Sequence, residues 1–391
     1  MAATAPKSPG VRTPSIDYLR SFITLLVLFV HAILAYSTWS RFNPENFSHS
    51  VAPIVDPIKW AGFDLAPPLL NTFIMPLMFF ISGLFVWKSL TRKGPRYFLR
   101  DRLLRLGAPF VISLVVIMPL AYYPSFLQSS QRLDFFTYWR SWEWISGPAW
   151  FVSMLLVFNL LAALCFWVSP GSVWARRVPQ AVFTNPMVFF LVLVGAALIA
   201  FLPLLYLYGP FTWFYWGPCL IGQSSRLLLY LVYFFAGVAV GAYGLDGSFL
   251  GPALSRRWLP WSVAAVLQIP LFALALAGVP GDSSAALVPT SQGWLLFGFS
   301  MVLCSAIFSL ACMSLFLRFV NRRERILDFF SDNAYGIYLV HYPLVIWTQF
   351  LLVDSTLPAP AKASIVLIFS LLFSWFISAF LRSFSVVRNI I

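Results

Sequence analysis

Charged residues are scarce in this sequence. They make up 10% of its 391 residues, whereas 60% are hydrophobic, and a soluble globular domain carries roughly 25% charged residues. The water-exposed surface of a fold of this size needs more polar groups than the sequence supplies. The composition therefore excludes an ordinary soluble domain and points to the lipid bilayer as the surrounding solvent.

Residues that could build a metal site or a disulfide framework are also few. The four Cys include no CxxC pair and the three His are dispersed along the chain, so we predict no metal site. A net charge of +13 is compatible with a nucleic-acid partner, but the basic residues lie in short segments between apolar stretches, where they act as topology signals. We expect no nucleic acid among the partners.

Apolar stretches of about 17–25 residues, each long enough to cross a bilayer as a helix, recur along the chain. The sequence therefore predicts an all-α, polytopic integral membrane protein with about ten transmembrane helices. We expect a disordered cytoplasmic tail over residues 1–14 and one transmembrane domain over residues 15–391. The predicted spans lie near residues 16–38, 68–90, 104–123, 149–168, 187–208, 227–244, 259–279, 294–317, 334–353 and 363–382.

Lys and Arg are distributed unevenly between the two sides of these predicted spans. With the N-terminus in the cytoplasm, 20 of the 26 Lys and Arg fall on the cytoplasmic side and 6 on the other, whereas the acidic residues divide 6 to 7. This asymmetry is the positive-inside pattern. We therefore predict a multi-pass protein with both termini in the cytoplasm.

The first predicted span carries ionisable residues, which are rare at membrane depth and require a reason. Arg20 and His31 are separated by a rotation of about 20° and by about 16 Å along the helix axis, so they share one face. Asp17 lies within about 40° of that face. We expect Arg20 at the cytoplasmic edge and His31 at or beyond the middle of the membrane.

Acyl transfer from a CoA thioester suits this arrangement. A basic group at the membrane edge binds the anionic nucleotide, the thin pantetheine arm enters an apolar channel, and a deeper His removes the proton of an acceptor hydroxyl as general base. The simpler interpretation is a snorkelling Arg with an interfacial His hydrogen-bonded to a neighbouring helix. The rarity of such residues within spans favours the functional interpretation.

Two further groups of polar residues stand near predicted spans. Arg102 and Arg105 share a helix face, which suits either phosphate binding or plain anchoring at the cytoplasmic surface. Tyr338 and His341 also share a face, in a span for which Asn333 is the predicted N-cap. For His341 a hydrogen bond between helices is slightly favoured over a direct chemical role.

Tryptophans are concentrated in one predicted external segment, around Glu143. They suit either stacking on sugar rings or an aromatic belt at the membrane surface, and the belt is the favoured interpretation. These residues are Trp139, Trp142, Trp144 and Trp150.

Taken in order along the chain, these features resemble the membrane acyltransferase family 3. The family's Arg-x10-His pattern is matched by Arg20 and His31, and its Arg-x-x-Arg pattern by Arg102 and Arg105. Its other motifs are matched by the Phe-rich run 75–83 that ends in Ser82-Gly83, by the pair Trp150-Phe151 and by the run 331–341 that ends at His341.

The resemblance implies an enzyme that takes acyl groups from cytoplasmic acyl-CoA, a co-substrate rather than a permanently bound cofactor. It delivers them to a hydroxyl of an extracytoplasmic glycan or glycolipid. The chain is most similar to members that add succinyl or related groups to periplasmic glucans, which implies a bacterial inner membrane. The implied site consists of His31 as general base with Asp17 and His341 for catalysis, Arg20, Arg102 and Arg105 for CoA, and Ser82, Trp150 and Tyr338 for substrate.

Several alternatives stay open at this level. Transfer is either direct or passes through an acyl-histidine intermediate. The main alternative class is a transporter or flippase for a lipid or glycan, which spans with many Pro and Gly breaks also suit. The sequence has no pair of short, broken helices at corresponding positions of two halves, which weakens that alternative. A catalytically inactive scaffold would tolerate the loss of both Arg20 and His31.

Overall fold

The computed structural model describes residues 14–129, 133–168, 178–217, 220–279, 291–388 and 390. Apart from Pro14, the predicted N-terminal tail lies outside these residues. Regular structure in the described ranges is almost entirely helical, with one short antiparallel hairpin, which confirms the predicted all-α class. The helices are α1 (Pro14–Leu34), α2 (Ala66–Gly83), α3 (Val86–Arg102), α4 (Ala108–Ile112), α5 (Met118–Gln128), α6 (Phe135–Arg140), α7 (Trp150–Val168), α9 (Gln180–Thr184), α10 (Pro186–Tyr208), α11 (Leu227–Tyr243), α12 (Pro252–Ser255), α13 (Trp258–Ala277), α14 (Ser291–Phe319), α15 (Arg325–Leu352), α16 (Ala359–Ser383) and α17 (Ser385–Arg388).

Shorter elements connect these helices. Two π-helical segments continue the chain between α3 and α5, where a helix gains an extra residue per turn. The hairpin pairs Trp213 with Gln223 and Trp216 with Leu220. These elements are the π segments η3 (Leu103–Gly107) and η4 (Ser113–Ile117), the 3-10 segments η1 (Phe47–His49), η2 (Ala61–Phe63), η5 (Gly147–Ala149), η6 (Ser224–Arg226) and η7 (Leu245–Gly247), and the strands β1 (Trp213–Trp216) and β2 (Leu220–Gln223).

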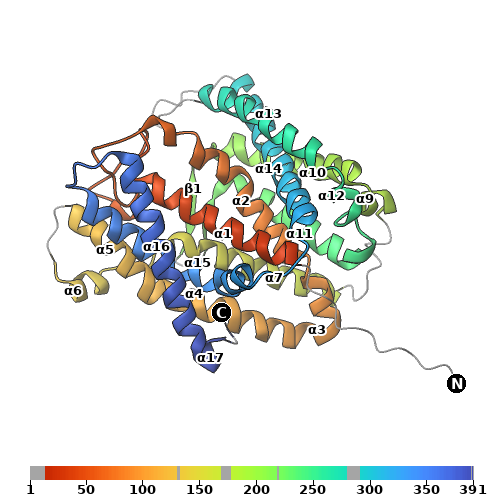
Figure 1. Cartoon of the computed structure of the whole chain (residues 1–391), viewed down its shortest axis with the longest axis horizontal. Helices are drawn as coiled ribbons and strands as arrows, with labels where there is room; N and C mark the ends of the chain where they lie inside the picture. Colours follow the sequence, from red (N-terminus) through yellow and green to blue (C-terminus); the bar gives the residue numbers. More distant parts are fainter. Residues whose placement is uncertain are drawn as a thin grey trace.

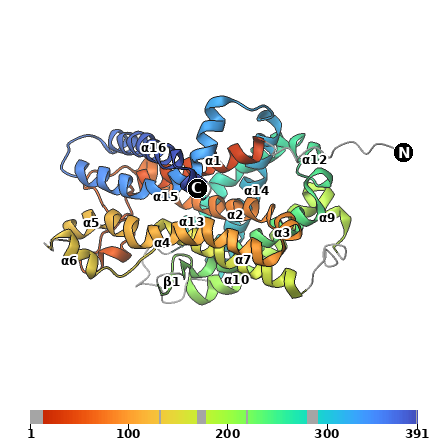
Figure 2. The same cartoon turned by 90° about the horizontal axis from the view of Figure 1, so that it is seen from below.

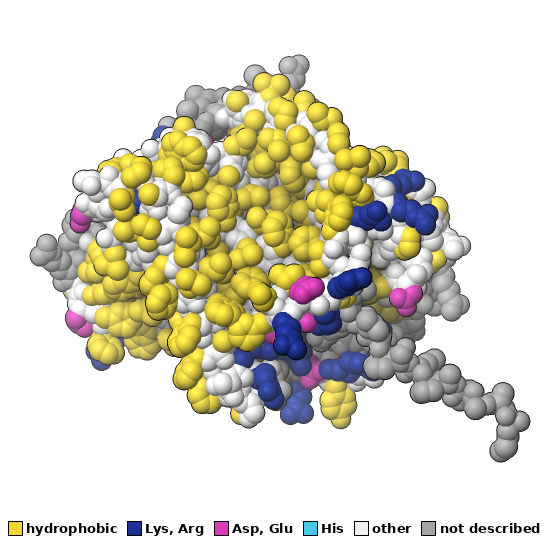
Figure 3. All heavy atoms as spheres, viewed as in Figure 1, with side chains coloured by type: hydrophobic (Ala, Val, Ile, Leu, Met, Phe, Trp, Pro, Cys, Tyr) yellow, Lys and Arg dark blue, Asp and Glu magenta, His cyan; other side chains and the backbone are white. Residues whose placement is uncertain are grey.

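The long helices form one bundle in which α1 occupies a central place. It contacts α2, α14, α15 and α16, as Figures 1 and 2 allow the reader to follow. The face drawn in Figure 3 is largely hydrophobic, and most of its visible Lys and Arg lie toward the end that carries α3, α12 and α17. An apolar side surface is what a protein surrounded by lipid requires.

Nine helical segments among the described residues are long and apolar enough to cross a membrane, so the chain is a multi-pass membrane protein. They coincide with all the predicted spans except that near residues 334–353. This tenth predicted span lies within α15, which is 28 residues long but is less apolar because it carries residues such as Asp328, His341 and Gln349. The nine segments are Pro14–Leu34, Ala61–Gly83, Val86–Gln128, Gly147–Val168, Pro186–Tyr208, Ser224–Tyr243, Trp258–Ala277, Gly293–Phe319 and Ala359–Ser383.

The segment Val86–Gln128 is 43 residues long, about twice what one crossing needs. It bends at Gly94, whose φ of 74° lies in the left-handed region that only glycine adopts freely. Pro95 follows and lacks the N–H needed to continue the helix ladder. The bend separates the first half of α3 from the second half, which leads to Arg102 and Arg105.

Three prolines later in this segment leave backbone carbonyls without their helical N–H donors. Side chains of other helices donate to these carbonyls instead. Pro109 has no N–H for the carbonyl of Arg105, four residues earlier, and the Tyr335 hydroxyl of α15 donates to that oxygen at 2.9 Å. The same relation recurs twice, with Trp139 donating to Val115 at 2.8 Å before Pro119 and Trp347 donating to Leu120 at 2.9 Å before Pro124. The hydrogen bonds fix α15 and α6 against the bent segment.

Glycine permits a close contact between the helices α2 and α11. A Cβ on Gly237 would lie 2.1 Å from the carbonyl oxygen of Phe80, and one on Gly241 would lie 2.1 Å from that of Leu84. Gly83 faces α11 in the same way. Small residues four apart allow backbones to approach this closely in membranes, where packing rather than the hydrophobic effect holds helices together.

The predicted N-cap role of Asn333 is wrong. Helix α15 begins at Arg325, two turns earlier, and Asn333 lies inside it. Its side-chain amide donates to the carbonyl of Phe329 at 2.8 Å and its amide oxygen accepts from Ser378 of α16 at 2.9 Å. Contact with α16 thus keeps this polar stretch helical.

Candidate active site

Two histidines from distant parts of the sequence meet where α1 and α15 lie side by side. His31 stands in the last turn of α1 and is half-buried, whereas His341 is fully buried in α15. Their ring centroids are 5.5 Å apart with an interplanar angle of 36°. The structure thus brings together two of the residues that the sequence singled out for catalysis.

Hydrogen bonding defines the state of His341. Its Nδ1 lies 2.6 Å from the carbonyl oxygen of Tyr338. A carbonyl only accepts, so Nδ1 carries the proton and Nε2 presents a lone pair. Within the described part of the chain, Nε2 is buried without a hydrogen-bond partner. The atom is therefore a buried acceptor that no described residue uses.

Aromatic rings surround the histidine pair. Tyr342 packs edge-on against His31 at a centroid distance of 5.1 Å, and its hydroxyl lies 3.5 Å from that of Tyr122 in α5. Tyr338 contacts His341 at 5.8 Å and donates to the carbonyl of Pro148, just before α7. These rings are apolar apart from their phenol hydroxyls, and His341 among them is shielded from bulk water.

Trp150, predicted to contact substrate, lies outside the rings that contact the histidine pair. Its indole stacks on Tyr230 at 5.6 Å and meets Trp213 of the hairpin edge-on at 6.2 Å. The next residue, Phe151, contacts Tyr338 at 6.0 Å. Trp150 therefore joins the hairpin to the aromatic surroundings of His341 without touching either histidine.

The three arginines predicted to hold CoA lie together near the start of α1. Arg102 is half-buried, with its guanidinium 5.0 Å from the centroid of Phe98, and it lies close enough to Arg20 and Arg105 for their charges to interact. Arg20 and Arg105 are exposed. Like charges held at close range repel, and an anion such as a phosphate would relieve this repulsion.

Asp17 and Ser82 do not lie with the histidine pair. Asp17 is near the start of α1, about 21 Å along the axis from His31, and its carboxylate faces Arg323 at 3.9 Å. Ser82 is near the end of α2, where its neighbour Ile81 lines the same gap as Leu19 of α1. Asp17 therefore cannot act on a group held at His31, and Ser82 lies away from the histidine pair.

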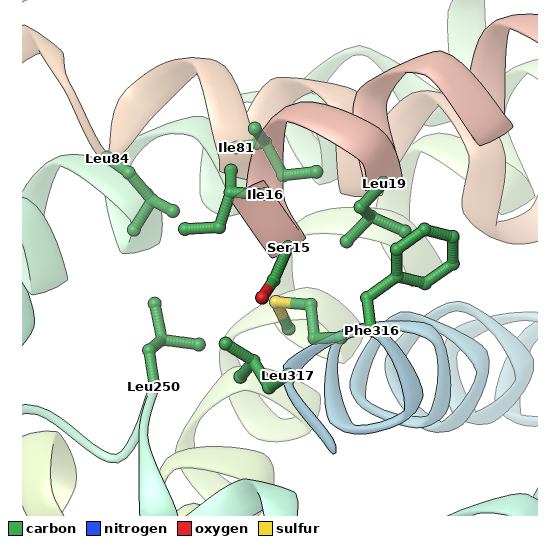
Figure 4. A pocket seen from close by; sticks show the side chains of 9 residues that line it. Ser15, Ile16, Leu19, Ile81, Leu84, Leu250, Phe316 and Leu317 are labelled. Carbon is green, nitrogen blue, oxygen red and sulfur yellow. The ribbon is translucent and has the colours of Figure 1, made fainter. Parts of the chain in front are cut away.

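An apolar gap separates this end of α1 from α2 and α14. Figure 4 shows its lining, in which Ile16, Leu19 and Phe316 point into a space of about 10 Å³. Such a volume holds no more than about one water molecule, and among the lining residues Ser15 alone is polar. The gap is therefore no candidate for the reaction.

A buried ion pair near the histidines was not predicted. Lys362 of α16 and Asp56 have 0% and 1% side-chain exposure, and their charged atoms are 2.7 Å apart. The backbone N–H of Asp56 donates to the carbonyl of Ala35, directly after α1. The ion pair thus holds the segment between α1 and α2 against α16. A lone Lys at the start of an apolar stretch was the one signal in the sequence.

Neighbouring side chains complete this region. Gln349 donates to the carbonyls of His31 and Ala32 at 2.8 and 3.3 Å, so α15 satisfies acceptors that the end of α1 leaves open. Burial raises the pKa of Tyr36, and the nearby Asp56 carboxylate acts in the same direction. Tyr36 is consequently a neutral phenol in this segment.

Known proteins with similar sequences indicate the family of this chain. The chain is 23% identical over 354 residues to glucans biosynthesis protein C of Salmonella typhi, an alignment that covers 87% of this chain and 84% of the relative. The protein of the same name from Salmonella typhimurium matches to the same extent. No solved structure matches.

A family model described as an acyltransferase domain matches residues 13–379. This range contains both histidines, all three arginines and the aromatic residues that surround the pair. The chain therefore belongs to the membrane acyltransferase family 3.

Proposed function

We propose that this membrane acyltransferase moves an acyl group, such as acetyl or succinyl, from cytoplasmic acyl-CoA to a hydroxyl of an extracytoplasmic glycan or glycolipid, with His31 as general base. The observation that carries the proposal is the pairing of two clusters along α1: the arginines near Arg20 and the histidine pair at His31. The intervening distance of about 16 Å suits an extended pantetheine arm.

The acceptor class is supported by the similar proteins and by the position of the pair. The Salmonella relatives are named for glucan biosynthesis, and a glucan offers hydroxyl groups as acyl acceptors. His31 lies in the last turn of α1, toward the end of the bundle opposite the arginines. An acceptor can therefore approach from one side while the acyl donor approaches from the other.

The reaction assigned to the pair is a balanced acyl transfer. The acceptor oxygen attacks the thioester carbonyl while His31 takes the hydroxyl proton, the C–S bond breaks, and the leaving thiolate takes the proton from His31. Two protonated imidazoles 5.5 Å apart would repel by about 3 kcal/mol at an effective dielectric constant of about 20. The pair therefore carries at most one added proton at a time. While His31 is protonated, His341 stays neutral, and its Nε2 can accept from a second hydroxyl of the acceptor.

The orientation proposed here places both termini in the cytoplasm of a bacterium and the protein in the inner membrane. Lys and Arg are concentrated at the end that carries α3, α12 and α17. This concentration supports the assignment of that end to the cytoplasm. Acyl-CoA is then a co-substrate that binds from the cytoplasm, and the proposal includes no permanently bound cofactor.

The experiment uses the purified chain in lipid nanodiscs with acetyl-CoA or succinyl-CoA and a gluco-oligosaccharide. Free CoA is measured with a thiol reagent and the acylated sugar by mass spectrometry. We expect His31→Ala to lower kcat at least about 100-fold, as loss of a general base does, with its unfolding temperature retained. A folded His31→Ala variant with unchanged transfer would exclude the proposed role.

The same experiment separates the alternatives. A transporter or flippase releases no CoA when sugar and acyl-CoA are added together. Incubation with radiolabelled acyl-CoA alone distinguishes the two chemical routes, because an acyl-histidine intermediate leaves label on the protein before any acceptor is added.

A further inference from the structure

The hairpin exposes aromatic side chains at the end of the bundle where α1 finishes. In β1, Trp213, Tyr215 and Trp216 are 40%, 42% and 66% exposed. Alternate residues of a strand point to the same face, so Trp213 and Tyr215 share one. Trp213 reaches Trp150 and Tyr215 reaches His49, with ring centroids 4.4 Å apart. The face thus continues into neighbouring segments.

Polar groups border this aromatic face. Ser48 donates to a carboxylate oxygen of Glu143 at 2.8 Å, and Nδ1 of His49 lies 3.8 Å from the same oxygen. The His49 Nδ1 also lies 2.6 Å from the amide oxygen of Asn46. The Glu143 side chain is 61% exposed, so it keeps acceptor capacity that no described residue fills.

The backbone holds Glu143 in place by an unusual conformation. The next residue, Trp144, has a φ of 57°, in the left-handed region that bulky residues rarely adopt. Two other tryptophans of this segment are fixed by the fold itself, since Trp139 donates to Val115 and Trp142 is 3% exposed. They are structural, and Trp144 and the hairpin supply the exposed rings.

The aromatic face connects to the histidine pair through a series of rings. The series runs from Trp213 through Trp150, Phe151 and Tyr338 to His341, which faces His31. Each consecutive pair of rings is in contact along this series. A molecule bound at the face would therefore lie next to the residues that lead to His31.

We propose that the acceptor glycan docks on this surface, which we call the hairpin platform and define by His49, Glu143, Trp144, Trp213 and Tyr215. The inference rests on the proposed function, which requires an acceptor at this end of α1. Sugars offer an apolar C–H face and a rim of hydroxyls, and the platform offers aromatic rings beside a carboxylate and an imidazole.

A lipid-facing aromatic belt is the competing interpretation of these rings. Rings in such a belt gain from their place at the interface and need no ordered polar partners. The hairpin platform differs because His49 packs on Tyr215 while Glu143, Ser48 and Asn46 form a hydrogen-bonded rim. Exposed polar groups of fixed geometry beside rings are what orients a ligand in a binding site.

The experiment measures binding of a gluco-oligosaccharide to the chain in nanodiscs by calorimetry, without acyl-CoA. We expect Tyr215→Ala and Glu143→Gln each to weaken binding roughly 10-fold, while Tyr215→Phe, which keeps the ring, binds nearly as the unchanged protein. Trp167→Ala is the matched control, because Trp167 is 74% exposed at the far end of α7.

Acyl transfer by the same variants separates this inference from the proposed function. We expect a raised KM for the sugar with KM for acyl-CoA unchanged. Unchanged sugar binding in both Tyr215→Ala and Glu143→Gln would overturn the platform while leaving the enzymatic role intact. Weakened binding in these variants without CoA release by any variant would support the platform and exclude the acyltransferase reaction.

Discussion

Replacing Lys362 by Met removes the side-chain cation that binds the buried Asp56 carboxylate. The charged atoms are 2.7 Å apart, with 0% and 1% side-chain exposure. At an effective dielectric constant of about 20 their attraction is about 6 kcal/mol, most of which offsets the cost of burying the two charges. Removing one partner leaves the other charge buried, which costs about 3–5 kcal/mol.

The double variant provides the decisive comparison. Asp56→Asn with Lys362→Met leaves no charge in the site, and the new amide oxygen can still accept from the N–H of Ile58, as the carboxylate does at 2.8 Å. We therefore expect the double variant to be more stable than either single variant, with a coupling free energy of at least about 2 kcal/mol.

Thermal unfolding in detergent micelles, followed by circular dichroism, measures all four proteins. Both single variants should also lose acyl transfer, because Asp56 holds the segment that follows α1 beside the histidine pair. If the double variant loses as much stability as the two single variants together, the two charges do not stabilise one another and the reasoning fails.

Three further predictions concern helix contacts and the arginines. Tyr335→Phe should lower stability by about 1 kcal/mol because the Arg105 carbonyl loses its donor; an unchanged melting temperature would contradict this. Gly237→Ala should cost about 1–3 kcal/mol, since the added Cβ falls 2.1 Å from the Phe80 carbonyl oxygen, and a melt at the original temperature would show that the helices move apart freely. Arg102→Gln should raise KM for acyl-CoA roughly 10-fold with kcat retained, whereas the exposed Arg256→Gln serves as control; equal effects of the two would exclude a specific phosphate site.

The sequence was sufficient for features that depend on local pattern. Apolar stretches located the spans, because a span in lipid must be continuous and apolar. The regular rotation of a helix placed Arg20 and His31 at opposite ends of one face. These predictions require no knowledge of which helices touch.

The sequence did not predict which residues of different helices contact one another. Helices in lipid associate through close packing and scattered polar contacts, which leave little periodic signal. The meeting of His31 with His341 and the pairing of Asp56 with Lys362 each join residues about 300 positions apart. The sequence singled out the two histidines, each considered alone, and it missed both Asp56 and Lys362.

Local signals were also misread where two interpretations competed. The polar run before residue 334 resembles a helix start, yet α15 passes through it from Arg325 because α16 supplies hydrogen-bond partners. Gly217, whose φ of 65° suits the turn of the hairpin, lies between two predicted spans, where no strand was predicted. The exposed rings of β1 therefore escaped notice.

The proline-associated carbonyls of the segment Val86–Gln128 have a mechanical consequence. Tyr335 and Trp347 donate hydrogen bonds to this segment at two points about 18 Å apart along α15. One point is the carbonyl of Arg105 and the other lies near Tyr122. Sliding α15 along its axis would break both hydrogen bonds at once. The arginines that we propose bind CoA and the residues around the histidines are consequently held by the same helix, so a displacement of either group is transmitted to the other.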